Sequence, residues 1–282
     1  MNIQWYPGHM TKAKRMMQED IKLIDLVIEI IDARIPISSR NPDIDELAKG
    51  KARMILLNKA DLANPSVNKR WVDYYKKKGI LCVQTDARSR NGFSAIMNSI
   101  DEAVKEKKER DLKRGILNRP VRTMVVGIPN VGKSTFINSL CKKAAAKTGN
   151  KPGVTKGKQW IKLNGGVELL DTPGILWPKF EDAKTGLKLA FIGSVNDEIL
   201  NEEELSVELI KILVRDYKGL LFERFGIDEG MEPYVILEQI AGKRGCLKKG
   251  EAFDLLKAAR IVLDEFRSGK LGKISLEEPW DE

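Results

Sequence analysis

The order of three short motifs is the sequence feature that most restricts how this chain can fold. Asn58-Lys59-Ala60-Asp61 comes first, a glycine-rich segment over residues 127–134 follows, and Asp171-Thr172-Pro173-Gly174 comes last. In an ordinary guanine-nucleotide hydrolase the glycine-rich segment leads and the Asn-Lys-x-Asp motif lies near the end. The rotated order predicts that the same strands and helices are connected here as a circular permutation.

Short apolar segments alternate with helix-like segments through the first part of the chain. The expected strands and then the expected helices are residues 26–31, 54–57, 81–85, 123–126 and 167–170, and residues 67–78, 94–114 and 134–142. Buried strands that alternate with helices indicate a parallel sheet covered on both faces. In such a sheet ligands bind at the carboxyl ends of the strands, where all three motifs fall. The predicted fold class is α/β, a P-loop NTPase of circularly permuted GTPase topology.

The pattern changes after Trp177-Pro178. Residues 204–215, 233–241 and 253–266 carry apolar side chains three to four residues apart, which is typical of amphipathic helices. We therefore predict a permuted GTPase domain over residues 1–177, with an N-terminal arm over about residues 1–22, and a smaller all-α C-terminal domain over residues 178–282.

Residues 127–134 match Gly-x-x-x-x-Gly-Lys-Ser between a predicted strand and a predicted helix. Glycines permit the tight turn in which backbone amides surround phosphates, and the helix N-terminus adds a favourable dipole. Lys133 is expected to neutralise the β- and γ-phosphates, and the Ser134 hydroxyl to bind Mg²⁺. The residues expected to contact GTP or GDP in this loop are Asn130, Val131, Gly132, Lys133, Ser134 and Thr135.

Asn58-Lys59-Ala60-Asp61 follows a predicted strand and is expected to bind the base. The Asp61 carboxylate can accept the N1–H and the exocyclic N–H of guanine, a donor pair that adenine lacks, so GTP is preferred over ATP. Thr85-Asp86-Ala87 ends the next strand, where a second base-contact loop is expected. This tripeptide departs from the common Ser-Ala-Lys form, and whether Asp86 or Ala87 contacts guanine stays open.

Asp171 follows an apolar strand and is expected to act on Mg²⁺ through water, while the Gly174 amide senses the γ-phosphate. Thr155 lies upstream in a basic segment, and we expect its hydroxyl to bind Mg²⁺ when GTP is present. The residue after Gly174 is Ile175, where many GTPases use Gln to orient the attacking water. His9 is the one histidine of the chain, and a structural role and a catalytic role are alternatives for it.

The net charge of +9 is unevenly distributed along the chain. Residues 1–178 carry 33 Lys and Arg against 18 Asp and Glu, whereas residues 179–282 carry 16 against 22. Between Asp111 and Glu168 there are twelve Lys or Arg and no acidic residue. Such a stretch is often only a well-solvated surface, but its length favours a polyanion partner, with nucleic acid expected.

Other features of the composition narrow the class of protein. No apolar stretch approaches the roughly 20 residues of a membrane span, and the N-terminus resembles neither a secretory signal nor a transit peptide. The three cysteines form neither a metal motif nor a disulfide framework. We therefore expect a cytoplasmic protein without membrane contact, and a monomer.

Taken together, these residues resemble the circularly permuted GTPases of the YlqF/RbgA family, which are bacterial factors for assembly of the large ribosomal subunit. The resemblance covers essentially the whole chain and is carried by the reversed motifs and by three further segments: residues 5–10 (Trp-Tyr-Pro-Gly-His-Met), residues 32–42, and residues 171–178 (Asp-Thr-Pro-Gly-Ile-Leu-Trp-Pro).

The resemblance implies a P-loop GTPase domain followed by a helical RNA-binding domain, and GTP hydrolysis stimulated by the large (50S) ribosomal subunit and its rRNA. It also implies that His9 is catalytic and that Asn130 coordinates K⁺. Because residues 179–282 are net acidic, RNA contact there is expected from the local cluster at residues 243–249.

Two other functions are compatible with the same motifs. The chain could be a regulatory switch whose GTP-bound form recruits a protein partner, and stimulation by a protein alone would favour that function. An ATP-using kinase is less compatible, because Asn58 and Asp61 would then have no role.

Overall fold

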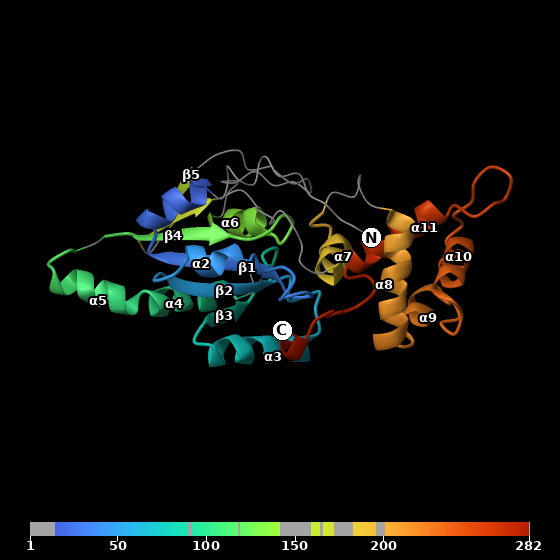
Figure 1. Ribbon diagram of the computed structural model, residues 1–282, viewed down its shortest axis with the longest axis horizontal. Helices are drawn as coiled ribbons and strands as arrows, with labels where there is room; N and C mark the ends of the chain where they lie inside the picture. Colours follow the sequence, from blue (N-terminus) through green and yellow to red (C-terminus); the bar gives the residue numbers. More distant parts are fainter. Residues whose placement is uncertain are drawn as a thin grey trace.

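The computed structural model describes residues 15–89, 92–117, 119–141, 159–163, 166–171, 183–195 and 201–281. These residues form a β-sheet with helices on both sides and, next to it, a bundle of helices (Figure 1). In this part of the chain, no helix has the length and apolar character needed to cross a membrane.

The described residues contain one six-stranded sheet with the order β3-β2-β1-β4-β6-β5. Its strands are β1 (Leu26–Asp32), β2 (Ala52–Asn58), β3 (Leu81–Gln84), β4 (Val121–Val126), β5 (Gln159–Leu163) and β6 (Val167–Asp171). Neighbouring strands are parallel, except that β5 is antiparallel to β6.

The sheet has the permuted GTPase topology that the motif order predicts. The strand that leads into the glycine-rich segment, β4, is fourth in the chain but pairs with β1 at the centre of the sheet. β2 and β3 continue the sheet on one side, and β6 and β5 continue it on the other. The half of the sheet that ends in the base motif therefore precedes the half that ends in the phosphate motif.

The five strands expected from the sequence are present, and β5 is a sixth that was not expected. The expected parallel sheet is confirmed, and β5 adds one antiparallel strand at its edge. The physical reason is the short connection between Leu163 and Val167, because a turn of that length can join only antiparallel neighbours. A parallel neighbour would need a crossover of a dozen or more residues.

Every residue of β1 is buried, as expected for a central strand covered on both faces. Ile28 and Ile30 belong to the cluster that contains side chains of α4 (Phe93–Ala103) and α6 (Lys133–Cys141). Ile31 belongs to the cluster beneath α3 (Pro65–Lys77). This alternation gives the strand a helix layer on each side.

One expected helix, residues 94–114, is interrupted. It consists of α4 and α5 (Lys105–Lys113), separated by Val104, whose ψ of 8° is not helical. Val104 is buried, whereas α5 has no buried residue and extends away from the sheet (Figure 1). The apolar stripe ends at Val104, so nothing holds the two segments in one straight helix.

The helical bundle is built on α8 (Glu202–Asp216) and α11 (Leu255–Ser268). Ala258 and Ala259 of α11 and Leu209 of α8 are fully buried in the same apolar cluster. The bundle also contains α7 (Ala183–Phe191), α9 (Leu220–Phe225) and α10 (Pro233–Lys243). The short helix α2 (Asp43–Leu47) packs instead against the sheet. Of these helices, α2, α7 and α9 were not expected from the sequence. The predicted boundary between residues 177 and 178 falls outside the described residues.

The end of the chain returns from the bundle to the sheet domain. Past α11, the Ile274 amide donates to the Leu62 carbonyl at 3.0 Å and the Leu276 amide donates to the Arg34 carbonyl at 2.8 Å. The indole N–H of Trp71 on α3 donates to the Glu277 carbonyl at 3.2 Å. This tail is a second physical link between the two parts.

Glu277 is a buried charged residue of the tail, with 2% of its surface exposed. Its carboxylate accepts the Ile37 amide at 2.6 Å, the Ser38 amide and the Ser38 hydroxyl, and it pairs with Lys188 of α7 at 3.0 Å. A buried carboxylate is stabilised when donors satisfy it in this way.

Glu277→Ala should therefore destabilise the protein by about 2–4 kcal/mol, because buried donors lose their acceptor. Glu278→Ala is the matched control. Glu278 pairs with the exposed Arg70 at the surface, where an ion pair contributes only about 0–1 kcal/mol. Chemical denaturation of both variants measures the difference, and equal losses would contradict this account of the tail.

Candidate nucleotide site

Polar residues follow the carboxyl ends of the central strands. β1 ends at Asp32 and β2 ends at Asn58, and these two residues are in register as neighbours. β4 ends at Val126, directly before the glycine-rich segment. Because the strands are parallel, the base motif and the phosphate motif emerge at the same edge of the sheet.

The glycine-rich segment forms a loop between β4 and α6 (Lys133–Cys141). Asn130 and Gly132 have positive φ angles of 62° and 95°, which bends the backbone into the tight turn of a phosphate loop. Lys133, Ser134 and Thr135 form the first turn of α6, where the N–H groups of the helix N-terminus and the helix dipole favour phosphate.

Two glycines of this loop have no room for a side chain. A Cβ atom on Gly127 would lie 2.6 Å from the Ile30 carbonyl oxygen. A Cβ atom on Gly132 would lie 2.3 Å from the Asn58 side-chain nitrogen. The first glycine lets the loop approach β1, and the second lets the base motif approach the phosphate loop.

The Asn58 side chain joins three segments of the site. Its Nδ2 donates to the Val131 carbonyl at 2.7 Å, and its Oδ1 accepts the Ala87 amide at 3.1 Å. The Ala87 carbonyl in turn accepts the Ser139 hydroxyl of α6 at 2.6 Å. The Ala87 amide thus bonds to the Asn58 side chain, and the contact of Asp86 or Ala87 with guanine stays a prediction.

Lys59 links the base motif to the phosphate loop. Its backbone has a positive φ of 57°, and its ammonium donates to the Asn130 carbonyl at 2.6 Å and pairs with Asp32 at 3.0 Å. Burial lowers the pKa of Lys59, and the Asp32 carboxylate opposes that shift. The ammonium is therefore held in place by a carbonyl on one side and a carboxylate on the other.

The carboxylates of Asp61 and Asp86 lie close enough to affect each other. Partial burial, followed by the negative charge of Asp86, raises the pKa of Asp61. The Ala60 amide donates to the Thr85 carbonyl at 3.2 Å, which fixes the two loops side by side. A guanine base would supply N–H donors to relieve this concentration of negative charge.

Asp32 and Arg34 form a buried ion pair at the same edge of the sheet. The guanidinium donates to the two carboxylate oxygens at 2.9 and 2.8 Å. Burial disfavours the charged carboxylate, but Arg34 and Lys59 outweigh it and hold the pKa of Asp32 well below its ordinary value. At the level of sequence these two residues contributed only to a family resemblance. Asp32 ends the strand next to the one that ends at Asn58, and this position in the sequence is the signal that could have placed the pair in the site.

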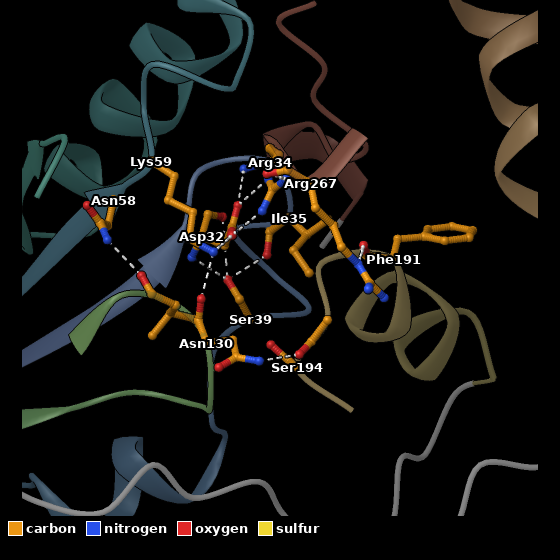
Figure 2. A network of polar contacts seen from close by, with 12 residues as sticks. Asp32, Arg34, Ile35, Ser39, Asn58, Lys59, Asn130, Phe191, Ser194 and Arg267 are labelled. Carbon is orange, nitrogen blue, oxygen red and sulfur yellow. Dashed lines mark hydrogen bonds and ion pairs between the residues drawn. The ribbon is translucent and has the colours of Figure 1, made fainter. Parts of the chain in front are cut away.

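The phosphate loop is in direct contact with the segment that follows α7 (Figure 2). The Asn130 side-chain amide donates to the Gly193 carbonyl, and the Ser194 hydroxyl donates to the Pro129 carbonyl at 2.7 Å. Arg267 at the end of α11 donates to the Ala190 carbonyl of α7 at 2.9 Å. These contacts were not expected from the sequence, because they join segments distant in the chain.

Three residues expected in the site, His9, Thr155 and Gly174, lie outside the described residues. Asp171 ends β6 in register with Val125 of β4, just before the phosphate loop. No group of three or more His, Cys, Asp or Glu side chains able to hold a metal ion occurs in the described ranges. The Ser134 hydroxyl and nucleotide phosphates would offer a cation oxygen donors of the kind that suit Mg²⁺.

Several of the basic residues between Asp111 and Glu168 already have acidic or aromatic partners. Arg119 pairs with Asp25 at 3.7 Å, and Arg122 pairs with Glu168 at 3.5 Å while stacking on Trp160. Lys113, Arg114 and Lys162 are exposed. Lys133 is buried in the phosphate loop, and the six basic residues from residue 142 to residue 158 are outside the described residues.

Comparison with known proteins gives concordant results. A family model described as "50S ribosome-binding GTPase" matches residues 122–228. Ribosome biogenesis GTPase A of Bacillus cereus is 49% identical over 280 residues, which span 99% of this chain and 95% of that protein. The Thermotoga maritima protein of the same name is 34% identical over 99% of this chain and 95% of its own length.

The solved structure of GNP-bound YlqF from T. maritima superposes with a TM-score of 0.69 at 31% sequence identity. The match covers 95% of this chain and 98% of that one. The similarity therefore extends over the sheet and the helical bundle alike.

The close contact at Gly132 gives a prediction about nucleotide binding. Gly132→Ala should lower GDP affinity at least about tenfold, because the added methyl group displaces Asn58 and breaks a buried hydrogen bond. Gly79→Ala is the matched control, since Gly79 also has a positive φ but a Cβ atom there would meet no other atom within 4 Å. Both variants should lose about 1 kcal/mol of stability through backbone strain, and Gly132→Ala should lose more because it also breaks the buried Asn58 hydrogen bond. Calorimetric titration with GDP distinguishes them, and equal affinities would contradict the proposed contact.

Proposed function

This chain belongs to the ribosome biogenesis GTPase A family, and from that premise we propose that it binds the precursor of the large (50S) ribosomal subunit and hydrolyses GTP to drive or check a late assembly step. Family membership makes it a GTPase of ribosome biogenesis. The subunit, the step and the coupling of hydrolysis to that step are the proposal. We further propose that it works as a cytoplasmic monomer.

The observation that carries the proposal is the direct contact between the phosphate loop and the helical bundle. Asn130 and Pro129 bond to Gly193 and Ser194, which follow α7. A change at the nucleotide phosphates can therefore reach the bundle without passing through the apolar core. A GTPase that alters its hold on a large particle needs such a coupling.

The permuted chain supplies a second route for the same coupling. Residues 171–174 lead from β6 towards α7, so a switch at Gly174 that senses the γ-phosphate is joined covalently to the bundle. GTP would favour the arrangement that binds the ribosomal precursor, and hydrolysis would release it. We propose that residues 178–282 act as the ribosome-binding helical domain in this cycle.

Mg²⁺ is the cofactor that GTPases of this kind use, and Ser134, Thr155 and Asp171 are proposed to hold it, Asp171 through water. Its charge would stabilise the negative charge that develops on the phosphate oxygens. Asn130 is proposed as a ligand of K⁺ at the same loop. Replacing potassium with sodium in a turnover assay tests that second cation.

The rRNA contact is proposed to use exposed basic residues of both parts. In the cluster at residues 243–249, Arg244 pairs with Glu265 at 3.2 Å and stacks on Phe225, so it is a structural residue of the bundle. Lys243, Lys248 and Lys249 are exposed and suited to phosphate contact. Binding through such residues falls steeply as salt concentration rises.

GTP turnover measured with and without purified large subunits, in potassium buffer, tests the proposal. We expect stimulation of about 10³-fold or more if docking completes the catalytic site, as an arginine finger does in other GTPases. Small subunits serve as the control. Stimulation by a protein fraction without ribosomes, and none by large subunits, would instead favour a regulatory switch that recruits a protein partner.

His9 is proposed to orient the attacking water, because Ile175 stands where many GTPases have Gln. His9→Ala should lower turnover by about 10²-fold or more, in the range typical of a lost acid–base group, while the dissociation constant for GTP changes little. His9→Gln should restore part of the rate, since an amide can also orient water. Unchanged turnover in His9→Ala would remove His9 from the mechanism.

A further inference from the structure

Lys59 connects the two halves of the nucleotide site, and its position depends on groups outside the recognised motifs. Its ammonium reaches from the base motif to the Asn130 carbonyl of the phosphate loop, at 2.6 Å. A lysine side chain is flexible, and fixing its rotamers costs free energy. A second interaction of the ammonium is therefore needed to keep it at the Asn130 carbonyl.

The ion pair with Asp32 is this second interaction. Its Oδ2 lies 3.0 Å from the Lys59 ammonium, and the Asp32 side chain is completely buried. Its Oδ1 accepts the backbone amide of Arg34 at 3.1 Å and the Arg34 Nε at 2.9 Å. Each oxygen of the carboxylate thus has two donors, which leaves it little freedom to rotate.

Arg34 anchors this carboxylate to the helical bundle. Its guanidinium is 1% exposed, and its Nη1 lies 3.4 Å from the carbonyl oxygens of Phe266 and Arg267. These carbonyls are at the C-terminal end of α11, where a cation is favoured by the helix dipole. The guanidinium also stacks on the Phe266 ring at 5.1 Å. The end of α11 therefore holds the Arg34 guanidinium both by hydrogen bonds and by stacking.

We propose that Asp32, anchored by Arg34, is a positioning residue for guanine-nucleotide binding: it holds the Lys59 ammonium on the Asn130 carbonyl and so fixes the spacing between the base loop and the phosphate loop. Asp32 acts through Lys59 and does not touch the nucleotide. The role rests on the GTPase activity of the family and is independent of the ribosomal step proposed above.

The physical reason lies in the charges of this buried cluster. Asp32 is the one carboxylate that pairs with Lys59 or Arg34 in the part of the chain that the structure describes. Without it, an ammonium and a guanidinium would face each other with no anion between them, and their repulsion would drive Lys59 away from Asn130. The affinities for GDP and for GTP should fall equally, because the γ-phosphate takes no part in the contacts of Lys59 with Asn130 and Asp32.

A double-mutant cycle with Asp32→Asn and Lys59→Met tests this assignment. Asp32→Asn should raise the dissociation constants of GDP and GTP by about 10- to 100-fold, the range expected for a charge-assisted hydrogen bond. The turnover rate at saturating GTP should stay within about twofold of the wild-type rate, because the lost interaction stabilises the ground state and the transition state equally. In the Lys59→Met background, Asp32→Asn should add no more than about twofold. Asp101→Asn, which removes an exposed partner of Lys108, is the matched control and should leave binding unchanged.

Arg34→Lys provides a milder variant if Asp32→Asn does not fold, as judged by thermal unfolding. It keeps a cation but loses the planar fork, so both dissociation constants should rise a few-fold, again only when Lys59 is present. The proposal would be overturned by any of three results. These are a full loss of affinity on adding Asp32→Asn to Lys59→Met, a loss of affinity for GTP alone, and unchanged affinity for both nucleotides. A failure of ribosomal stimulation would leave these binding results unaffected, so the two proposals can fail separately.

Discussion

The pairing of β1 with β4 is the interaction on which the rest of this structure depends. It joins two halves that lie far apart in the chain, one ending in the base motif and the other in the phosphate loop. Only when these strands are adjacent can Asn58 bond to Val131 and Lys59 to Asn130. The close approach also explains why position 132 is glycine, since a Cβ atom there would overlap Asn58.

Permutation changes what surrounds this pairing but leaves the site intact. Along the chain, β1 is the first strand of the sheet and β6 is the last, so the chain leaves the nucleotide domain beside the phosphate loop. The segment after β6 enters the helical bundle, and the tail after α11 returns to Leu62 and Arg34 beside the base motif. The bundle is therefore held against the nucleotide site by one chain connection and by the hydrogen-bonded tail, and hydrogen bonds between the bundle and the phosphate loop can form with little further loss of entropy.

Local chemistry determined which parts could be predicted from the sequence. Strands such as Leu26–Asp32 are largely apolar, and the glycine-rich loop has few alternative structures, so fold class and motif placement followed directly. β5 was missed because Gln159–Leu163 mixes polar and apolar residues at a sheet edge. The roles of Arg34, Gly193 and Glu277 could not be predicted, because each depends on partners from another part of the chain.

The same contacts limit how the protein can work as a switch. A coupling of 1–3 kcal/mol between two sites changes affinity by about 5- to 150-fold, and it must act equally in both directions. The hydrogen bonds from Asn130 to Gly193 and from Ser194 to Pro129 contribute about 0.5–1.5 kcal/mol each when solvent competition is included. A few such bonds therefore suffice for coupling, provided that they differ between nucleotide states. It follows that whatever holds the bundle in a new position, a ribosomal particle included, must also alter the affinity of the phosphate loop for nucleotide.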